Sequence, residues 1–111
     1  MNIFDLPKGL PEEEFFEALI PDRGILIERI ISTGQVSPPD FWYDQERDEW
    51  VVMLQGEAIL QWQDGSEQKL LPGDWVCIPA HKRHRVSYTS VNPPCVWLAV
   101  HGQLGLSTNR E

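Results

Sequence analysis

Short apolar stretches separated by turn residues run through most of the chain, from residue 25 onward. The stretches are rich in β-branched and aromatic residues, and they end at turn signals such as Gln55-Gly56, Asp64-Gly65 and Pro72-Gly73. An Asp-Gly pair between apolar runs is a strong signal for a short hairpin. The predicted strands cover residues 25–31, 50–54, 58–63, 68–71, 75–78, 83–89 and 95–101. This rhythm predicts an all-β protein, an antiparallel sandwich or barrel.

The chain before this region predicts a different structure. Residues 11–20 predict one short helix, because Pro11 suits the first helical turn and the three acids that follow it complement the helix dipole. Pro21 ends the helix. Its apolar stripe consists of Phe15, Phe16, Leu19 and Ile20. The expected organisation is an N-terminal arm and short helix at 1–23, a barrel at 24–102 and a flexible polar tail at 103–111.

Alternation along the strands predicts which side chains face the interior. His84 and Tyr88 share one face of their strand with an apolar neighbour, so His84 is expected to point inward. Glu49 precedes a strand whose two faces carry Val51 and Met53 on one side and Trp50, Val52 and Leu54 on the other. A strand that is apolar on both faces must be covered on both, by another sheet, the N-terminal helix or a second subunit. We therefore expect a homodimer.

Composition and charge narrow the range of partners. The 111 residues fit one domain, and 41% hydrophobic with 23% charged residues is an ordinary globular mixture. A formal net charge of -8 disfavours nucleic acid and anionic membranes, because both require a positive surface. No apolar run approaches the roughly 20 residues that span a bilayer, and the N-terminus lacks the features of a signal peptide. Cys77 and Cys95 are therefore expected to be reduced thiols in the cytoplasm.

One segment combines glycine, proline and histidine at a specific spacing. Gly73 is followed six positions later by Pro79, and His84 comes five positions after that. This segment resembles the second motif of the cupin superfamily, G-x5-P-x-G-x2-H-x3-N, in which the histidine binds a metal. Two positions depart from the pattern, since His81 stands at its second glycine and Tyr88 at its asparagine.

The first cupin motif, G-x5-H-x-H-x3-4-E-x6-G, is matched only in its second half. Glu49 is followed by six residues and then by Gly56. The two histidine positions depend on whether three or four residues precede the glutamate, and both registers are open. They fall on Tyr43 and Gln45 or on Trp42 and Asp44. The run from residue 42 to 50 is similar to a branch of small single-domain bacterial cupins.

The resemblance implies a double-stranded jelly roll with a ligand pocket inside the barrel. It also implies a divalent transition metal such as Zn, Fe, Mn or Ni, because a mixed nitrogen and oxygen shell suits these ions. The implied metal ligands are His84 and Glu49, completed by Asp44, Gln45 or Tyr43. The acid–base candidates are Glu49 and Tyr43. The predicted pocket residues are Trp42, Tyr43, Gln45, Trp50 and Tyr88.

Two hypotheses of function follow. In the first, the barrel binds a small molecule together with a metal held by His84 and Glu49, with oxygenase, isomerase and lyase activities all open. In the second, it is a metal-free ligand-binding or regulatory module, because both motif-one histidines are replaced. Structural interpretations compete with both. His84 would then be a barrel histidine bonded to Tyr88 or Glu49, and Glu49 a solvated residue of a charged loop.

Overall fold

The computed structural model describes residues 1–106, which form eight strands in two antiparallel sheets. The strands are β1 (Phe15–Ala18), β2 (Leu26–Ser32), β3 (Asp48–Gln55), β4 (Ala58–Trp62), β5 (Glu67–Leu70), β6 (Trp75–Ile78), β7 (His84–Thr89) and β8 (Cys95–Gly102). One sheet has the order β1-β2-β8-β3-β6, and the other has the order β5-β4-β7. The prediction of an all-β fold with antiparallel sheets is confirmed.

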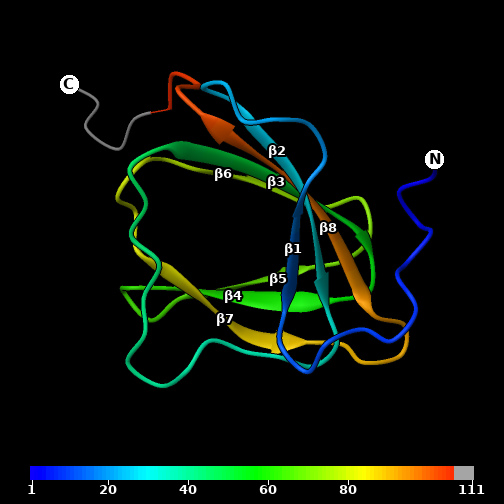
Figure 1. Ribbon diagram of the computed structural model, residues 1–111. Helices are drawn as coiled ribbons and strands as arrows, with labels where there is room; N and C mark the ends of the chain where they lie inside the picture. The colour runs from blue at the N-terminus through cyan, green and yellow to red at the C-terminus, as the bar shows by residue number, and fades with distance from the viewer. Residues whose placement is uncertain (107–111) are drawn as a thin grey trace.

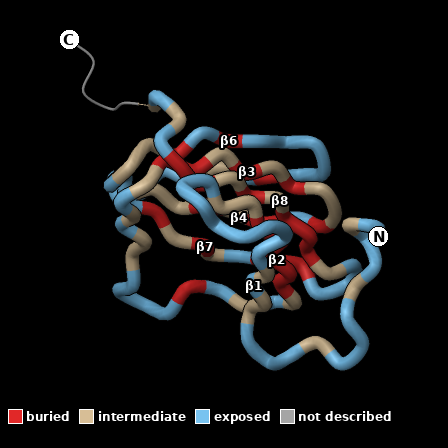
Figure 2. Tube along the Cα trace, turned by 45° about the horizontal axis from the view of Figure 1, so that its top comes forward, coloured by how far each residue is buried: buried red, intermediate tan, exposed pale blue. Residues whose placement is uncertain are grey.

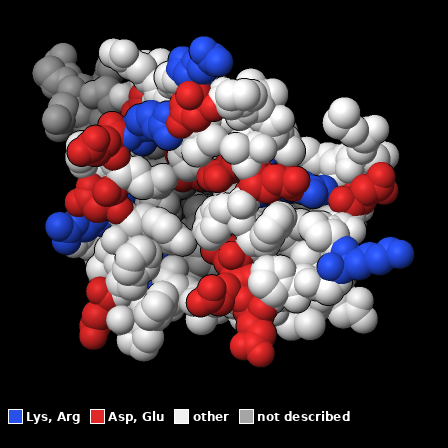
Figure 3. Space-filling model, in the orientation of Figure 1, with Lys and Arg blue, Asp and Glu red and all other residues white. Residues whose placement is uncertain are grey.

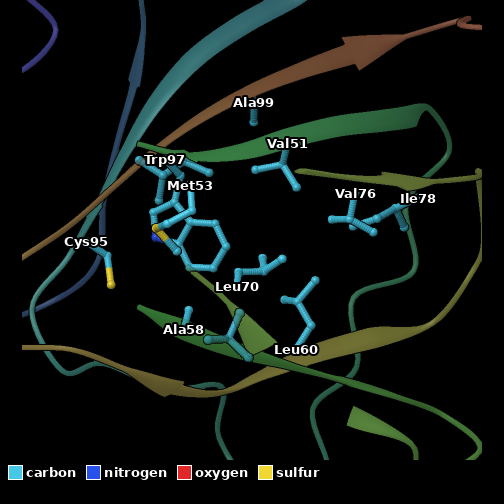
Figure 4. Close-up of a cluster of buried hydrophobic side chains, with 12 residues drawn as sticks. Val51, Met53, Ala58, Leu60, Leu70, Val76, Ile78, Cys95, Trp97 and Ala99 are labelled. Carbon is cyan, nitrogen blue, oxygen red and sulfur yellow. The ribbon is translucent and has the colours of Figure 1, made fainter. Parts of the chain in front are cut away.

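The two sheets face each other across a shared interior (Figure 1). Inward-pointing side chains from both sheets meet there, as alternation along each strand requires. Figure 4 shows Met53 and Trp97 of the larger sheet pointing toward Ala58, Leu60 and Leu70 of the smaller one. This packed cluster holds the sheets together and forms part of the wall of the cavity described below.

The helix predicted over residues 11–20 is wrong. The described residues contain no helix, and Phe15–Ala18 instead form β1, which pairs antiparallel with β2. A helix this short gains little stability by itself, whereas the free edge of β2 offers unpaired backbone groups to a neighbouring strand. The strand register turns Glu14 and Phe16 toward the interior, where both line a cavity.

The N-terminal arm is fastened to the outer face of the larger sheet. Arg29 of β2 donates hydrogen bonds to the carbonyl oxygens of Ile3 and Asp5, at 3.0 and 2.8 Å, and pairs with Glu17 of β1 at 2.6 Å. Buried residues lie mainly along the strands, while the loops are exposed (Figure 2). The predicted flexible tail, 103–111, extends beyond the described residues. Within residues 1–106, no helix has the length and apolar character to cross a membrane.

Gly56, the glycine that ends the first motif, lies where two segments approach closely. Its φ is +85°, in the left-handed region that favours glycine. An added Cβ would lie 2.9 Å from the Cα of Cys95 and 2.8 Å from the Oγ of Ser90. The turn after β3 therefore passes directly against the start of β8. This contact fixes the end of the strand that carries Glu49.

Candidate functional site

A cavity of about 80 Å³ lies between the two sheets. Its apolar wall, which belongs to the core cluster, consists of Ile30, Val51, Leu60, Ile78, Val86 and Trp97. The remaining wall consists of Glu14, Phe16, Glu28, Tyr43, Gln45, Glu49, His84 and His101. In the space-filling view of Figure 3, the surface is hollowed near the centre of the face shown, and acidic side chains border the hollow. The apolar surroundings make every charge inside the cavity costly to bury, and they strengthen the interactions between charges there.

The segment before β3 crosses the barrel mouth in a single register. Tyr43 forms an isolated bridge with His84, with backbone hydrogen bonds of 2.7 and 3.2 Å in the two directions. The backbone N–H of His81 donates to the carbonyl of Gln45 at 2.7 Å. This pairing turns Tyr43 and Gln45 toward the cavity, and the Tyr43 ring stacks on the His84 ring with centroids 5.3 Å apart. Of the two registers open from the sequence, the cavity takes Tyr43 and Gln45.

Asp44 lies on the outside instead. Its carboxylate is bonded to His81 Nδ1 at 2.7 Å and to Arg83 Nε at 3.1 Å, and these two bonds hold its pKa below the ordinary value. His81 adopts φ +66°, so it keeps the left-handed conformation of the glycine it replaces in the motif. Since side chains alternate along this segment, Asp44 points away from Glu49 and His84, and Trp42 also lies outside the cavity lining.

Trp50 and Tyr88, two further predicted pocket residues, also lie outside the cavity lining. Trp50 faces outward from β3 and contacts Trp75, with ring centroids 6.2 Å apart. Tyr88 is 45% exposed. The pairing of β7 with β4 slips between Ile59 and Leu60, because Ser87 is an extra residue in β7. A bulge of this kind reverses the side-chain alternation beyond it and turns Tyr88 to the exterior.

Glu49 is a buried carboxylate at the centre of the polar wall. It lies in β3 between Ile78 of β6 and His101 of β8. Its oxygens are 4.0 Å from His84 Nε2 and 3.9 Å from His101 Nε2. Burial raises the pKa of Glu49 to about 7, against the opposing influence of the charge on His101, and the charge of Glu28 adds to the rise. The group is therefore poised between its two protonation states near neutral pH.

His84 presents one ring nitrogen to this carboxylate. Its Nδ1 lies 2.9 Å from the carbonyl oxygen of Lys82, which can only accept a hydrogen bond, so Nδ1 carries the proton. Burial lowers the pKa of His84, and the ring is therefore neutral at physiological pH. The lone pair of Nε2 consequently faces Glu49 and the cavity. His84 thus lines the cavity, and its ring hydrogen bond goes to the backbone of Lys82 and not to Tyr88.

Glu28 and His101 complete the polar wall and were missed from the sequence. His101 Nε2 lies 2.9 Å from Glu28 Oε1. Burial opposes the charged imidazolium, but the bond to Glu28 and the negative charges nearby outweigh it and raise the pKa of His101. Neither residue belongs to a motif. The sequence does carry one signal for such residues, namely a polar side chain on the inward face of an apolar strand. His101 lies on the same face of its strand as Ala99 and Trp97.

Glu14 is the third carboxylate of the cavity. It accepts a hydrogen bond from the hydroxyl of Ser32, which fixes it beside β2. Burial is the main cause that raises the pKa of Glu14, with the charge of Glu28 acting in the same direction. A residue from the N-terminal segment thus contributes to the site, although the sequence assigned that segment to a helix outside the barrel.

The implied metal can be tested against these side chains. Imidazole and carboxylate donors of suitable chemistry are present, because His84, His101 and Glu49 share one wall. However, within residues 1–106 no three His, Cys, Asp or Glu side chains converge as a group that could hold a metal ion. Asp44 is turned outward, and His101 Nε2 is bonded to Glu28. Within the described residues, these side chains as arranged do not form a complete metal site.

Comparison with known proteins identifies the family. Residues 28–101 match the family model of the cupin domain (Cupin_2). The chain belongs to the cupins. A crystal structure from Ralstonia eutropha JMP134, described as a "putative mannose-6-phosphate isomerase", is 48% identical, with 93% of this chain and 96% of that chain covered and a TM-score of 0.85. A cupin superfamily protein from Desulfitobacterium hafniense DCB-2 is 20% identical, with 87% of this chain and 84% of that chain covered and a TM-score of 0.71. No curated protein matches the chain.

The family assignment confirms the jelly-roll fold expected from the two motifs. The motif positions occur at strand ends, since Gly56 directly follows β3, which carries Glu49, and Gly73 and Pro79 lie on either side of β6. Fold alone does not determine the chemistry, however, since jelly rolls serve unrelated functions. The side chains of the cavity must carry the functional argument.

Proposed function

We propose that this cupin binds a small molecule in its barrel cavity and transfers a proton on it, in an isomerase-type reaction of a small carbonyl compound. The observation that carries the proposal is Glu49, a buried carboxylate with a pKa of about 7 at the cavity wall. General acid–base catalysis works best when the pKa of the group lies near the working pH. Perturbed carboxylates in cavities are typical of functional sites.

The side chains around Glu49 suit each part of such a reaction. The Glu49 carboxylate takes the proton from the carbon next to the carbonyl, and the electron pair of that C–H bond moves toward the carbonyl oxygen. In a hydroxycarbonyl compound, the same group then returns the proton to the former carbonyl carbon, while the proton of the adjacent hydroxyl moves to the former carbonyl oxygen, so the reaction needs no oxidant. Tyr43 supplies a hydrogen-bond donor for the oxygen, because burial raises the pKa of its phenol to about 12 and keeps it protonated. Neutral His84 contributes an acceptor.

The 48% identical relative supports the reaction class, because its description names an isomerase. Its cited substrate is a phosphorylated sugar, and that substrate does not follow for this chain from sequence identity. The proposal therefore takes from the relative only the type of reaction, and takes the residues from the cavity.

A divalent metal on His84 and Glu49 is the competing proposal. One observation favours it, namely the unprotonated Nε2 of His84 facing a Glu49 oxygen at 4.0 Å. Elemental analysis of the purified protein and of His84→Ala tests it directly. A stoichiometric metal that is lost in the variant would support this proposal. Absence of metal from the native protein would leave proton transfer by the side chains alone.

Deuterium exchange tests the proton-transfer proposal. Three- and four-carbon hydroxycarbonyl and aminocarbonyl compounds are incubated with the protein in D2O, and loss of the proton next to the carbonyl is followed by NMR. We expect exchange with the native protein and a decrease of about 10²–10⁴-fold in Glu49→Gln, the usual contribution of a general base. Glu67→Gln, which removes an exposed carboxylate of β5, is the matched control and should keep the native rate. Equal rates in native protein and Glu49→Gln would contradict the proposal.

A further inference from the structure

The charges that line the cavity are almost all negative. Glu14, Glu28 and Glu49 reach it from the N-terminal segment, β2 and β3. Among the described residues that line it, none is a lysine or an arginine. The cationic partner available inside is His101, which is bonded to Glu28. Three carboxyl groups therefore share one imidazole, and no lysine or arginine in the lining offsets their negative charge.

Glu49 is the carboxylate that this arrangement leaves without a close cation. Its side chain is only 9% exposed and lines the cavity. Both imidazole nitrogens lie 3.9 Å or more from its oxygens, beyond hydrogen-bond distance. The three carboxyl groups line one cavity, so their like charges produce repulsion when they are ionised. A positive charge placed among them would relieve it.

Aromatic rings stand beside these carboxylates. Phe16, Tyr43 and Trp97 line the same cavity. The faces of aromatic rings attract cations, and this attraction grows when water is excluded. Carboxylates together with aromatic rings form a surrounding that recognises an ammonium group and offers a phosphate no donor of positive charge.

The entrance has the same character as the interior. An open groove of about 420 Å³ shares Glu14, Phe16 and Tyr43 with the cavity and continues past Glu12 and Glu13. No described residue that lines this groove is basic. A mouth lined by one sign of charge raises the local concentration of the opposite sign and speeds its entry.

Basic side chains of the described region are held elsewhere. Arg29, Arg47, Lys69 and Arg83 form ion pairs with Glu17, Asp22, Glu57 and Asp44, none of which lines the cavity. Lys82 lies over the Trp62 ring, 4.3 Å from its centroid. None of these cations reaches a ligand inside the barrel, so a phosphate there would meet three carboxyl groups and no lysine or arginine.

The size of the cavity limits the ligand further. One buried water needs roughly 10–15 Å³ of such space, so about 80 Å³ corresponds to roughly five to eight waters. We propose that the cavity selects a small ligand bearing a protonated amine and rejects phosphorylated ligands. This inference rests on the proposed function and names its substrate class. It also separates this chain from the phosphorylated sugar named for its 48% identical relative.

Isosteric ligands test the inference. Calorimetric titration and thermal shift are performed at one ionic strength with 4-amino-1-butanol, 1,4-butanediol, 4-hydroxybutyrate and inorganic phosphate. We expect the amine to bind at least about tenfold more tightly than the diol, and neither anion to stabilise the protein. Glu14→Gln should lower the affinity for the amine about tenfold and leave that for the diol unchanged. Glu67→Gln, the exposed control, should bind the amine as the native protein does.

Three results would overturn the inference. They are a diol or an anion that binds as tightly as the amine, an amine affinity unchanged in Glu14→Gln, and no stabilisation by the amine at about 50 mM. Circular dichroism of each variant excludes misfolding as the cause of lost binding. If the amine and the diol bind equally while Glu49→Gln abolishes deuterium exchange, the charge selection fails and the proposed function stands. If the amine binds selectively but no deuterium exchange occurs, the proposed proton transfer fails and the charge selection stands.

Discussion

Glu49 occupies a position where a carboxylate destabilises the fold. It lies in β3 between β6 and β8, within the polar wall of the cavity, and its nearest imidazoles are too distant to form hydrogen bonds. A buried carboxylate with no cation within hydrogen-bond distance is costly to ionise, and the group responds by holding its proton more tightly. An apolar residue would pack here at lower cost, so the glutamate is better explained by chemistry than by stability.

Glu49→Gln is expected to remove a pH dependence of stability. The pKa of Glu49 is about 7 in the folded protein and near its ordinary value of 4.5 when unfolded. The folded state therefore binds more protons between these values, and the free energy of unfolding falls as pH rises through this window, by about 3 kcal/mol in total. Urea unfolding at about pH 5 and about pH 8 should show a smaller loss in Glu49→Gln than in the native protein.

The exposed variant Glu67→Gln is the control for this measurement. It removes the same formal charge from the surface of β5, and its loss of stability between the two pH values should equal that of the native protein. If Glu49→Gln shows the native loss as well, the raised pKa of Glu49 is contradicted.

The candidate site was only partly predictable at the residue scale. Glu49 and His84 could be identified from motif spacing. The turns near them require glycine or proline, and these residues can be recognised in the sequence. The choice between Tyr43 with Gln45 and Trp42 with Asp44 depends on one residue of register, and a shift of one residue reverses every side chain. Only the pairing of Tyr43 with His84 resolves it. Glu28 and His101 were missed because no motif marks them.

At the scale of elements, the turn before β7 shows how a departure from the motif is accommodated. His81 occupies the position of a motif glycine and retains φ +66°. Histidine tolerates this region better than most residues, and its ring binds Asp44 at 2.7 Å. The turn thereby fixes Asp44 outside and, through the alternation, Tyr43 and Gln45 inside.

Two substitutions of His81 isolate the contribution of its left-handed backbone conformation to the free energy of unfolding. Both His81→Gly and His81→Ala lose the bond to Asp44, so the difference between them reports the left-handed conformation alone. We expect the glycine variant to be more stable by about 1 kcal/mol, measured by urea unfolding. At the neighbouring Lys82, which is not in the left-handed region, the alanine variant should be the more stable of the corresponding pair. The same order at both positions would contradict the assignment.

The strands were more predictable than the N-terminal element. Period-two alternation bounded by turns identified β2 to β8 within a few residues, because both signals are local. The segment before Pro21 has apolar residues that fit a helix and equally fit β1. Its structure is decided by the free edge of β2, a tertiary contact that the local pattern does not contain. The bulge in β7, which turns Tyr88 outward, is a second effect of this kind.

At the scale of the whole molecule, the distribution of charge matters more than the total of -8. The ion pairs that join Arg47 to Asp22 and Lys69 to Glu57 lie on the surface and contribute little to stability. They neutralise acids on the exterior, whereas in the described part of the chain no lysine or arginine pairs with the acids of the cavity and its mouth. The excess negative charge is thus concentrated where a ligand would enter.

The sequence predicts a homodimer, and the outer face of the larger sheet is the candidate interface. Its register places Trp50, Val52, Trp75, Leu98 and Val100 on one outward side. Trp75 is 58% exposed. We expect a dimer by size-exclusion chromatography with light scattering and a monomer for Trp75→Glu, because an unpaired carboxylate is costly to bury in an apolar interface. Val91→Glu, at a residue 63% exposed in the turn before β8, should remain dimeric. A monomeric native protein, or a dimeric Trp75→Glu, would show that this face is not the interface.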